Sequence, residues 1–132
     1  MQASLAYDSV VRRCTRVNMS PLLFARLLPG EMVKSGLLAL LDSQGTDRAV
    51  VLSGIGCLTK VKFRSLAAGK RIPISWDDFY KFELDGPFEL LSLEGNVFPT
   101  ESGEPFVHMH VLLGDQHGRV IGGHLDDAEV VT

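Results

Sequence analysis

The sequence predicts an α+β domain with one main helix followed by a largely antiparallel sheet of about six or seven strands. Two observations carry this prediction. Residues 31–41 place apolar side chains at helical spacing. After them come short segments rich in β-branched, aromatic and leucine residues, and Gly, Pro, Asn and Asp separate these segments.

Composition is that of an ordinary globular protein. The 132 residues suffice for one domain with a real core, and 45% of them are hydrophobic and 22% charged. A net charge of −3 does not indicate nucleic-acid binding by bulk charge. Cys14 and Cys57 lack a C-x-x-C partner, so no disulfide framework is expected. Without a signal-like apolar start or an apolar run of membrane length, we expect a cytoplasmic protein with no membrane partner.

The beginning of the chain divides into an arm and the first elements of the domain. Residues 1–19 are expected to form an N-terminal arm, and residues 20–132 the domain. The apolar run at residues 22–28 is a strand candidate that Pro29-Gly30 ends. The helix predicted over residues 31–41 has an apolar stripe made of Val33, Leu37, Leu40 and Leu41.

The middle of the chain predicts two strands, over residues 49–53 and 58–64, with a bend at Gly54-Ile55-Gly56 between them. In the second strand, Val61 and Phe63 alternate with basic residues. This basic row consists of Lys60, Lys62 and Arg64. Such a row is suited to contact phosphates, but it is also typical of the solvated side of a sheet.

Three further segments precede the end of the chain. Residues 72–74 are β-like but interrupted by Pro73, and residues 76–84 indicate a strand, or a strand after a turn. Residues 88–97 predict a strong strand, in which Gly95-Asn96 suggests a bulge or a bend. Alternation places four of its side chains on one face, namely Phe88, Leu90, Ser92 and Glu94.

Residues 106–125 predict a β-hairpin that carries three of the four histidines in its arms. A five-residue loop over residues 114–118 places His108 opposite His124, and His110, two residues along the strand, shares their face. A two-residue turn at Gln116-His117 would shift the pairing by one and send His124 to the other face. The convergence of the three histidines therefore depends on a loop of odd length.

Three imidazoles on one face predict a metal site formed by His108, His110 and His124. Neutral imidazoles with an open fourth position suit zinc best, followed by other late divalent transition metals. The alternative is that H-x-H on a strand is only half-buried polar alternation.

With these motifs in place, the chain shows a family resemblance. The stretches that carry it are L-P-G-E at 28–31, S-G-I-G-C at 53–57, G-P-F-E-L-L-S-L-E-G-N at 86–96, H-M-H-V-L-L-G-D at 108–115 and G-R-V-I-G-G-H-L at 118–125. Through them the chain resembles the PPC domain ("plants and prokaryotes conserved") over roughly residues 20–127.

The resemblance implies a compact unit with a curved antiparallel sheet, assembled as a homotrimer. In prokaryotic members the histidines that match His108, His110 and His124 hold a metal, often zinc. Plant members add an AT-hook that binds the DNA minor groove, and they contact nuclear factors through a G-R-F-E-I-L segment.

The chain departs from that pattern in three places. It contains no R-G-R-P core, and Pro87 replaces the arginine of G-R-F-E-I-L, which puts the plant-type contacts in doubt. Relatives also run on into another strand beyond the position of Thr132. Val130-Val131 would be its start, so the resemblance leaves open that the domain lacks its last strand.

Three functions remain in view. The first is a stand-alone PPC-domain protein, a metal-binding homotrimer that acts as a DNA-binding or regulatory module. In another, the metal is purely structural and holds the hairpin together. The main alternative is a zinc-dependent hydrolase or lyase acting on a small substrate. Such an enzyme also needs a general acid or base, and no spacing assigns that role among the available carboxylates Glu89, Glu94, Glu104 and Asp126.

Overall fold

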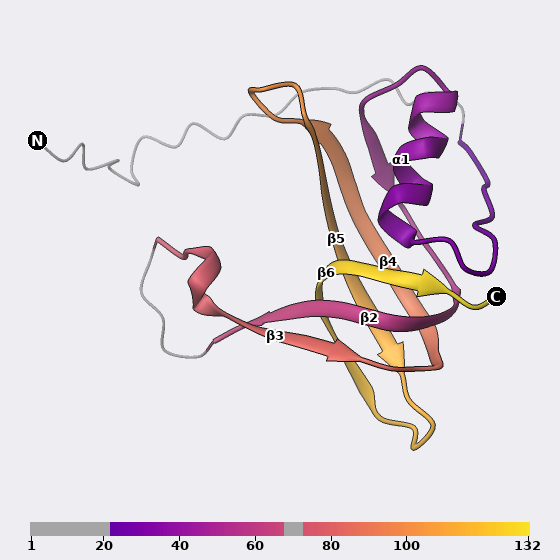
Figure 1. Ribbon diagram of the computed structural model, residues 1–132, viewed down its shortest axis with the longest axis vertical. Coiled ribbons are helices and arrows are strands. Elements are labelled where there is room, and N and C mark those ends of the chain that lie inside the picture. The colour runs from indigo at the N-terminus through magenta and orange to yellow at the C-terminus, as the bar shows by residue number, and fades with distance from the viewer. Residues whose placement is uncertain (1–21, 68–72) are drawn as a thin grey trace, which may run out of the picture.

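The computed structural model describes residues 22–67 and 73–132, and it confirms the α+β class (Figure 1). The arm predicted at residues 1–19 lies outside the described residues. The elements are α1 (Val33–Ser43), β1 (Ala49–Val51), β2 (Gly56–Leu66), the short 3-10 helix η2 (Trp76–Asp78), β3 (Phe79–Leu84), β4 (Phe88–Pro99), β5 (Pro105–Gly114) and β6 (Val120–Val130). Neither helix in this part of the chain has the length and apolar character needed to cross a membrane.

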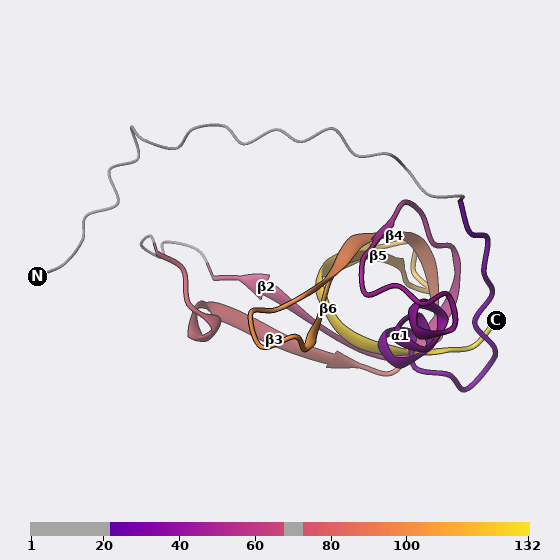
Figure 2. The same ribbon diagram turned by 90° about the horizontal axis from the view of Figure 1, so that it is seen from above.

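The six strands form one antiparallel sheet in the order β1-β4-β5-β6-β2-β3. Because β2 also pairs with β4, the strands β4, β5, β6 and β2 close on themselves. Figure 2 shows this closure end on, with β4, β5 and β6 curving round in a ring. The curvature that the family resemblance implied is therefore present, and it gives the sheet an enclosed face and an outer face.

One apolar cluster fills the enclosed side of the sheet. The alternation of buried and exposed side chains along β5 and β6 shows which side chains enter it. Met109, Leu113 and Val61 are the largest side chains that are fully buried. Because odd-numbered residues of β5 fill the core, the even-numbered residues, which include His108 and His110, point to the outer face.

Helix α1 is held against the end of β6 by backbone hydrogen bonds. The Gly30 N–H donates to the Val130 carbonyl at 2.9 Å, and the Val130 N–H donates to the Glu31 carbonyl at 2.8 Å. The Lys34 N–H donates to Oδ1 of Asp127 at 3.1 Å, which satisfies one of the free donors in the first helical turn. These bonds fix the beginning of the helix beside β6.

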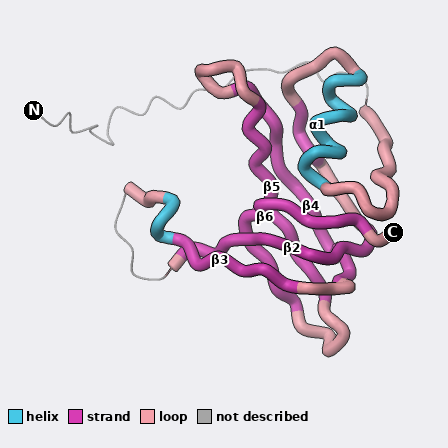
Figure 3. The backbone as a smooth tube through the Cα atoms, viewed as in Figure 1, coloured by secondary structure: helices cyan, strands magenta, loops and turns pink. Residues whose placement is uncertain are grey.

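The strand predicted at residues 22–28 is wrong, because these residues form no strand in the structure (pink in Figure 3). The segment runs instead past α1, where Leu27 contacts the position of Gly36. A Cβ at Gly36 would lie 2.8 Å from Cδ2 of Leu27, so a larger residue would require the Leu27 side chain to shift. Leu27 packs against the core, whereas the other large apolar side chains of the segment, those of Leu22, Leu23, Phe24 and Leu28, are exposed.

One other β-like segment is not a strand: of residues 72–74, the described Pro73 and Ile74 are not in a strand, and Ile72 lies outside the described residues. For residues 76–84, the prediction of a strand after a turn is confirmed, because a 3-10 turn with a capping box between Ser75 and Asp78 precedes β3. At the other end of the chain, Val130 is the last residue of β6 rather than the start of a further strand.

The bulge predicted at Gly95-Asn96 of β4 occurs earlier, at Leu91. The pairing with β5 passes from Leu90↔Leu113 to Ser92↔Leu112, so one residue of β4 is extra at this point. The predicted common face of Phe88, Leu90, Ser92 and Glu94 is therefore wrong. Phe88 and Leu90 are buried, whereas Ser92 and Glu94 are carried to the outer face.

Candidate metal centre

The hairpin of β5 and β6 brings His108, His110 and His124 together on the outer face of the sheet. Each histidine contributes one ring nitrogen, and these three nitrogens all lie within 4.8 Å of one another. The ring centroids are 5.2 Å apart for His108 and His110, 5.1 Å for His108 and His124, and 5.8 Å for His110 and His124. His108 and His124 are half-buried and His110 is exposed. The rings thus converge from two strands on a place that solvent can reach.

The register that produces this convergence differs from the predicted one. His124 pairs with His110 rather than with His108, and Gly114 pairs with Val120. The loop therefore spans residues 115–119, one position later than predicted and still five residues long. The pairing is shifted by two residues, and a shift of two preserves the face on which each side chain lies.

Asp115 explains the position of the loop. Its Oδ1 accepts hydrogen bonds from the backbone N–H groups of His117 and Arg119 at 2.8 and 2.9 Å. Its Oδ2 accepts from Nε of Arg119 at 2.6 Å. The backbone N–H of Arg119, together with its guanidinium and the His117 N–H, holds the pKa of this carboxyl below its usual value. Asp115 therefore belongs to the loop, and the last residue of β5 is Gly114 rather than Leu113.

His124 lies where the pairing of β6 passes from β5 to β2. It pairs with His110 of β5 and also with Arg64 of β2. At the preceding residue, a Cβ on Gly123 would collide with the carbonyl oxygen of Arg64, so glycine is required for β2 to approach this closely. The third histidine is thus placed by the closure of the sheet as well as by the hairpin.

The surroundings of His124 favour the neutral form of its imidazole. Burial lowers its pKa below the ordinary value of 6.5, and the neighbouring His108 lowers it further. Asp126 opposes this shift, and His110 and Arg64 add to it. A neutral ring retains the lone pair that a metal ligand needs.

The bulge in β4 adds two polar neighbours that sequence reasoning did not assign to the site. Glu94 pairs with His110, and Asn96 pairs with His108, so both project from the outer face beside the histidines. No signal in the sequence marks Leu91 as the bulged residue. Of the other carboxylates considered, Glu89 pairs with Gly114 at the far end of β5, and Glu104 lies in the loop before β5.

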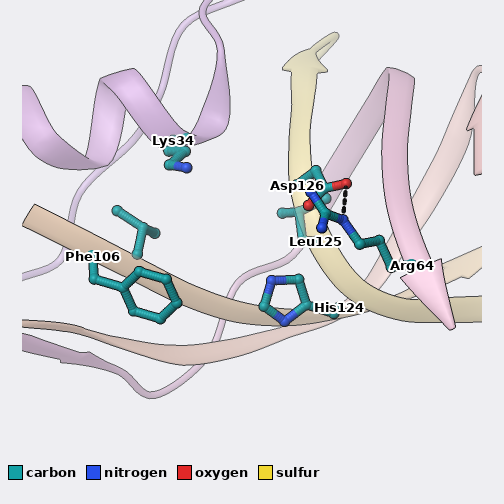
Figure 4. Close-up of a pocket in the computed structure, with 7 residues that line it drawn as sticks. Lys34, Arg64, Phe106, His124, Leu125 and Asp126 are labelled. Carbon is teal, nitrogen blue, oxygen red and sulfur yellow. Dashed lines mark hydrogen bonds and ion pairs between the residues drawn. The ribbon is translucent and has the colours of Figure 1, made fainter. Parts of the chain in front are cut away.

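A shallow hollow borders the histidine cluster on each side. One, of about 420 Å³, is lined by His110 together with Ser92 and Glu94. The other, of about 330 Å³, is lined by His124 together with Lys34, Arg64, Phe106 and Asp126 (Figure 4). The cluster is therefore accessible from two directions with different chemistry, one with a carboxylate and one with cations.

The basic row on β2 lies outside the core, because it alternates with the buried residues Val61 and Phe63. Each of its members has a carboxylate partner. The pairs are Lys60–Glu129 at 2.6 Å, Lys62–Glu83 at 2.5 Å and Arg64–Asp126 at 2.7 Å. The Glu129 and Glu83 carboxylates raise the pKa values of Lys60 and Lys62, respectively. The positive charge of the row is therefore largely compensated within the protein.

The fold and the site together define a small α+β domain with a curved antiparallel sheet and a histidine cluster on its outer face. The chain belongs to the Plants and Prokaryotes Conserved (PCC) domain family, which it matches over residues 16–132. This is the family named PPC above.

Solved structures with the same fold support this membership. A PPC protein from Pyrococcus horikoshii is 36% identical with a TM-score of 0.66, and the match covers 79% of this chain and 67% of that chain. A metal-containing protein from Archaeoglobus fulgidus is 34% identical with a TM-score of 0.65, covering 80% and 69%. A proposed DNA-binding protein from Ralstonia eutropha is 23% identical with a TM-score of 0.63, covering 79% and 66%, and shows the fold alone.

A curated relative has a much longer chain. The bifunctional protein GlmU of Synechococcus sp. (strain JA-3-3Ab) is 33% identical over 100 residues. These residues are 76% of this chain but only 14% of that protein, so the similarity concerns a small part of it.

Proposed function

We propose that this protein binds a divalent transition metal, zinc in the first place, through His108, His110 and His124. The observation that carries the proposal is the approach of the three ring nitrogens to within 4.8 Å of one another. Ligand nitrogens around a tetrahedral zinc lie about 3.3 Å apart, given bonds of about 2.0–2.1 Å. Small rotations of side chains on a solvent-accessible face are sufficient to close that difference. The metal-containing relative from Archaeoglobus fulgidus supports the same assignment.

Elemental analysis of the purified protein tests the site directly. We expect about one metal ion per chain, because three converging imidazoles form a site that competes well for late transition metals. Protein that contains no metal and that also fails to take up zinc in dialysis would refute the proposal.

We further propose that the protein is a homotrimer, as the family resemblance implies, and that the histidine face takes part in its assembly. Apolar side chains stand exposed on this face around the cluster, namely Val50, Phe98, Leu112 and Val120. Val50 and His108 both pair with Asn96, and Leu112 follows His110 by two residues, so alternation places them on one face. Exposed apolar surface of this kind favours contact with a second chain.

Light scattering with one substitution tests the assembly. Leu112→Glu places a charge in the proposed contact and is expected to yield a smaller species. Ile55→Glu is the matched control, because Ile55 is also exposed but lies in the connection between β1 and β2. A wild-type protein that is monomeric at working concentration contradicts the proposal.

Association with DNA or with a regulatory partner is the role we propose for this assembly. The structural neighbour from Ralstonia eutropha, described as a proposed DNA-binding protein, motivates it. The basic row of Lys60, Lys62 and Arg64 is the surface we would assign to phosphates. If it makes the contact, changing all three residues to methionine reduces the affinity for duplex DNA and flattens its salt dependence. Unchanged binding would exclude this surface.

A zinc-dependent hydrolase or lyase remains the second candidate, and the position of Glu94 favours it. Glu94 of β4 pairs with His110 of β5, and both line the same hollow. A zinc ion held by the histidines would supply Lewis-acid activation of water. Glu94 is the carboxylate placed to accept a proton there, with its Oε1 receiving a hydrogen bond from the Ser92 hydroxyl at 3.2 Å. Glu94→Gln is expected to abolish any hydrolysis of ester or phosphoester probes while leaving the metal content unchanged.

A further inference from the structure

The hollow beside His124 differs from its counterpart beside His110 because basic side chains contribute to its wall. Lys34 of α1 and Arg64 of β2 line it, and Figure 4 shows them on opposite sides with His124 between them. These three residues come from three elements that are far apart in the sequence. The closure of the sheet and the docking of α1 therefore create this arrangement.

The two cations of the hollow are not equivalent. Arg64 donates from Nε to Oδ2 of Asp126 at 2.7 Å, and both side chains are half-buried, so this pair is close to neutral as a unit. For Lys34, no ion pair exists among the residues that the structure describes. The hollow therefore keeps one uncompensated positive charge, on the ammonium group of Lys34.

A hydrogen bond of its backbone N–H fixes where the Lys34 side chain begins. Its N–H donates to Oδ1 of Asp127, and that oxygen also accepts from the Ala128 N–H at 2.9 Å. One oxygen of the Asp127 carboxylate is thus engaged by two backbone donors. The Lys34 side chain starts from a fixed place at the rim and is half-buried. A cation presented in this way loses less conformational entropy on binding an anion than a lysine on a free loop.

The remaining wall of the hollow is apolar. Phe106 and Leu125 contribute to it, and the ring of Phe106 lies 6.2 Å from that of His108, measured between centroids. The volume of about 330 Å³ is at the lower end of the range for small-molecule sites. A ligand that fits this wall has an apolar body of a few carbon atoms as well as a charged group.

We propose that this hollow binds a small organic oxyanion, a carboxylate or a phosphate monoester, between the histidine cluster and Lys34. Its charged group is shared between the metal and the Lys34 ammonium, and its apolar part lies along Phe106. This inference rests on the metal site proposed above and specifies the class of ligand that the site takes. It also predicts which face of the cluster a substrate approaches, whether the protein is an enzyme or a sensor.

The test uses full-length protein loaded with cobalt(II), whose visible spectrum responds to ligands, together with titration calorimetry. Phenyl phosphate and benzoate are the two oxyanion probes, and benzamide is the uncharged comparator. We expect one oxyanion to bind with a change in the cobalt spectrum and benzamide not to bind. The order of the two affinities distinguishes a phosphate ligand from a carboxylate ligand.

Three variants assign the binding to Lys34. Lys34→Met is expected to weaken the binding of the preferred oxyanion roughly tenfold, because a charge-assisted hydrogen bond is lost. Lys34→Arg keeps the charge and is expected to retain most of the affinity. Arg48→Met is the control, because it also removes one positive charge but Arg48 does not line the hollow. This variant should bind the oxyanion with the affinity of the wild type.

The outcomes separate this inference from the proposed metal site. Cobalt uptake of one ion per chain in wild type and in all variants shows that the metal site and the fold are intact. With cobalt bound, equal affinity of wild type and Lys34→Met, or equal binding of benzamide, overturns the oxyanion site alone. Failure of the wild type to take up cobalt overturns the metal site, and the oxyanion site with it.

Discussion

The histidine cluster and the basic row of β2 are two groups of ionisable side chains on the same sheet, and they differ in how their charges and lone pairs are used. In the basic row, each cation has its own carboxylate within 2.7 Å. In the histidine cluster, three ring nitrogens face one another. Paired opposite charges are already satisfied, whereas neutral imidazoles that converge keep lone pairs that a ligand can use.

This difference shows why the two sequence patterns are not equally good evidence of a binding site. H-x-H and K-x-K-x-R both alternate on a strand, and from the sequence alone both are compatible with a solvated face. Their cross-strand neighbours in the structure are different. His110 has His124 opposite it, whereas Lys62 has Asp127 and Glu83 opposite it.

The largest expected effect is the loss of metal from the histidine cluster. His124→Ala removes one of the three proposed ligands, and we expect at least a hundredfold loss of zinc affinity because two imidazoles are a poor site. Competition with a chromogenic chelator measures this change. His117→Ala is the control, since His117 lies in the hairpin loop outside the cluster. Equal zinc affinity in the two variants would remove the distinction between the two groups.

A smaller effect is expected where the basic row meets the site. Arg64→Met leaves the half-buried Asp126 without its partner, and the free energy of unfolding is expected to fall by about 1 kcal/mol. Urea denaturation of the metal-free protein measures it. Asp126→Asn in the same background should recover part of the loss, because it removes the unpaired charge. An Arg64→Met variant as stable as the wild type would show that the pair contributes nothing.

The pH dependence of the stability of the metal-free protein tests the contribution of His124. Its folded-state pKa is lower than the ordinary 6.5, so the unfolded chain binds the proton more readily. The stability that this group contributes is complete above pH 6.5 and is lost as the pH falls through the lowered value. We expect the urea midpoint to decrease as the pH falls below 6.5 and to decrease less in His124→Gln. Identical pH profiles would show that His124 is not the titrating group.

The smallest effect is expected at the exposed end of the basic row. Lys62 and Glu83 are both well exposed, so water screens their attraction. Lys62→Met should leave the urea midpoint unchanged within error, at low and at high salt. A clear loss of stability, present only at low salt, would mean that exposed pairs on this sheet matter more than their solvation suggests.

The sequence by itself determined the class of fold, the helix and the convergence of the three histidines. The convergence survived a wrong register because a strand has a period of two residues, and the error was also two. Segment 22–28 shows the limit of such patterns, because its apolar run predicted a strand, whereas in the structure it forms no strand and only Leu27 among its large apolar residues packs against the core.

Only the tertiary structure decided what surrounds the histidines. The bulge at Leu91 brings Glu94 and Asn96 to their face, and the closure of the sheet brings Arg64 beside His124. The docking of α1 on β6 brings Lys34 to the hollow that His124 and Arg64 line. Bulges, sheet closure and helix docking depend on contacts between residues far apart in the chain, and local alternation carries no record of those contacts.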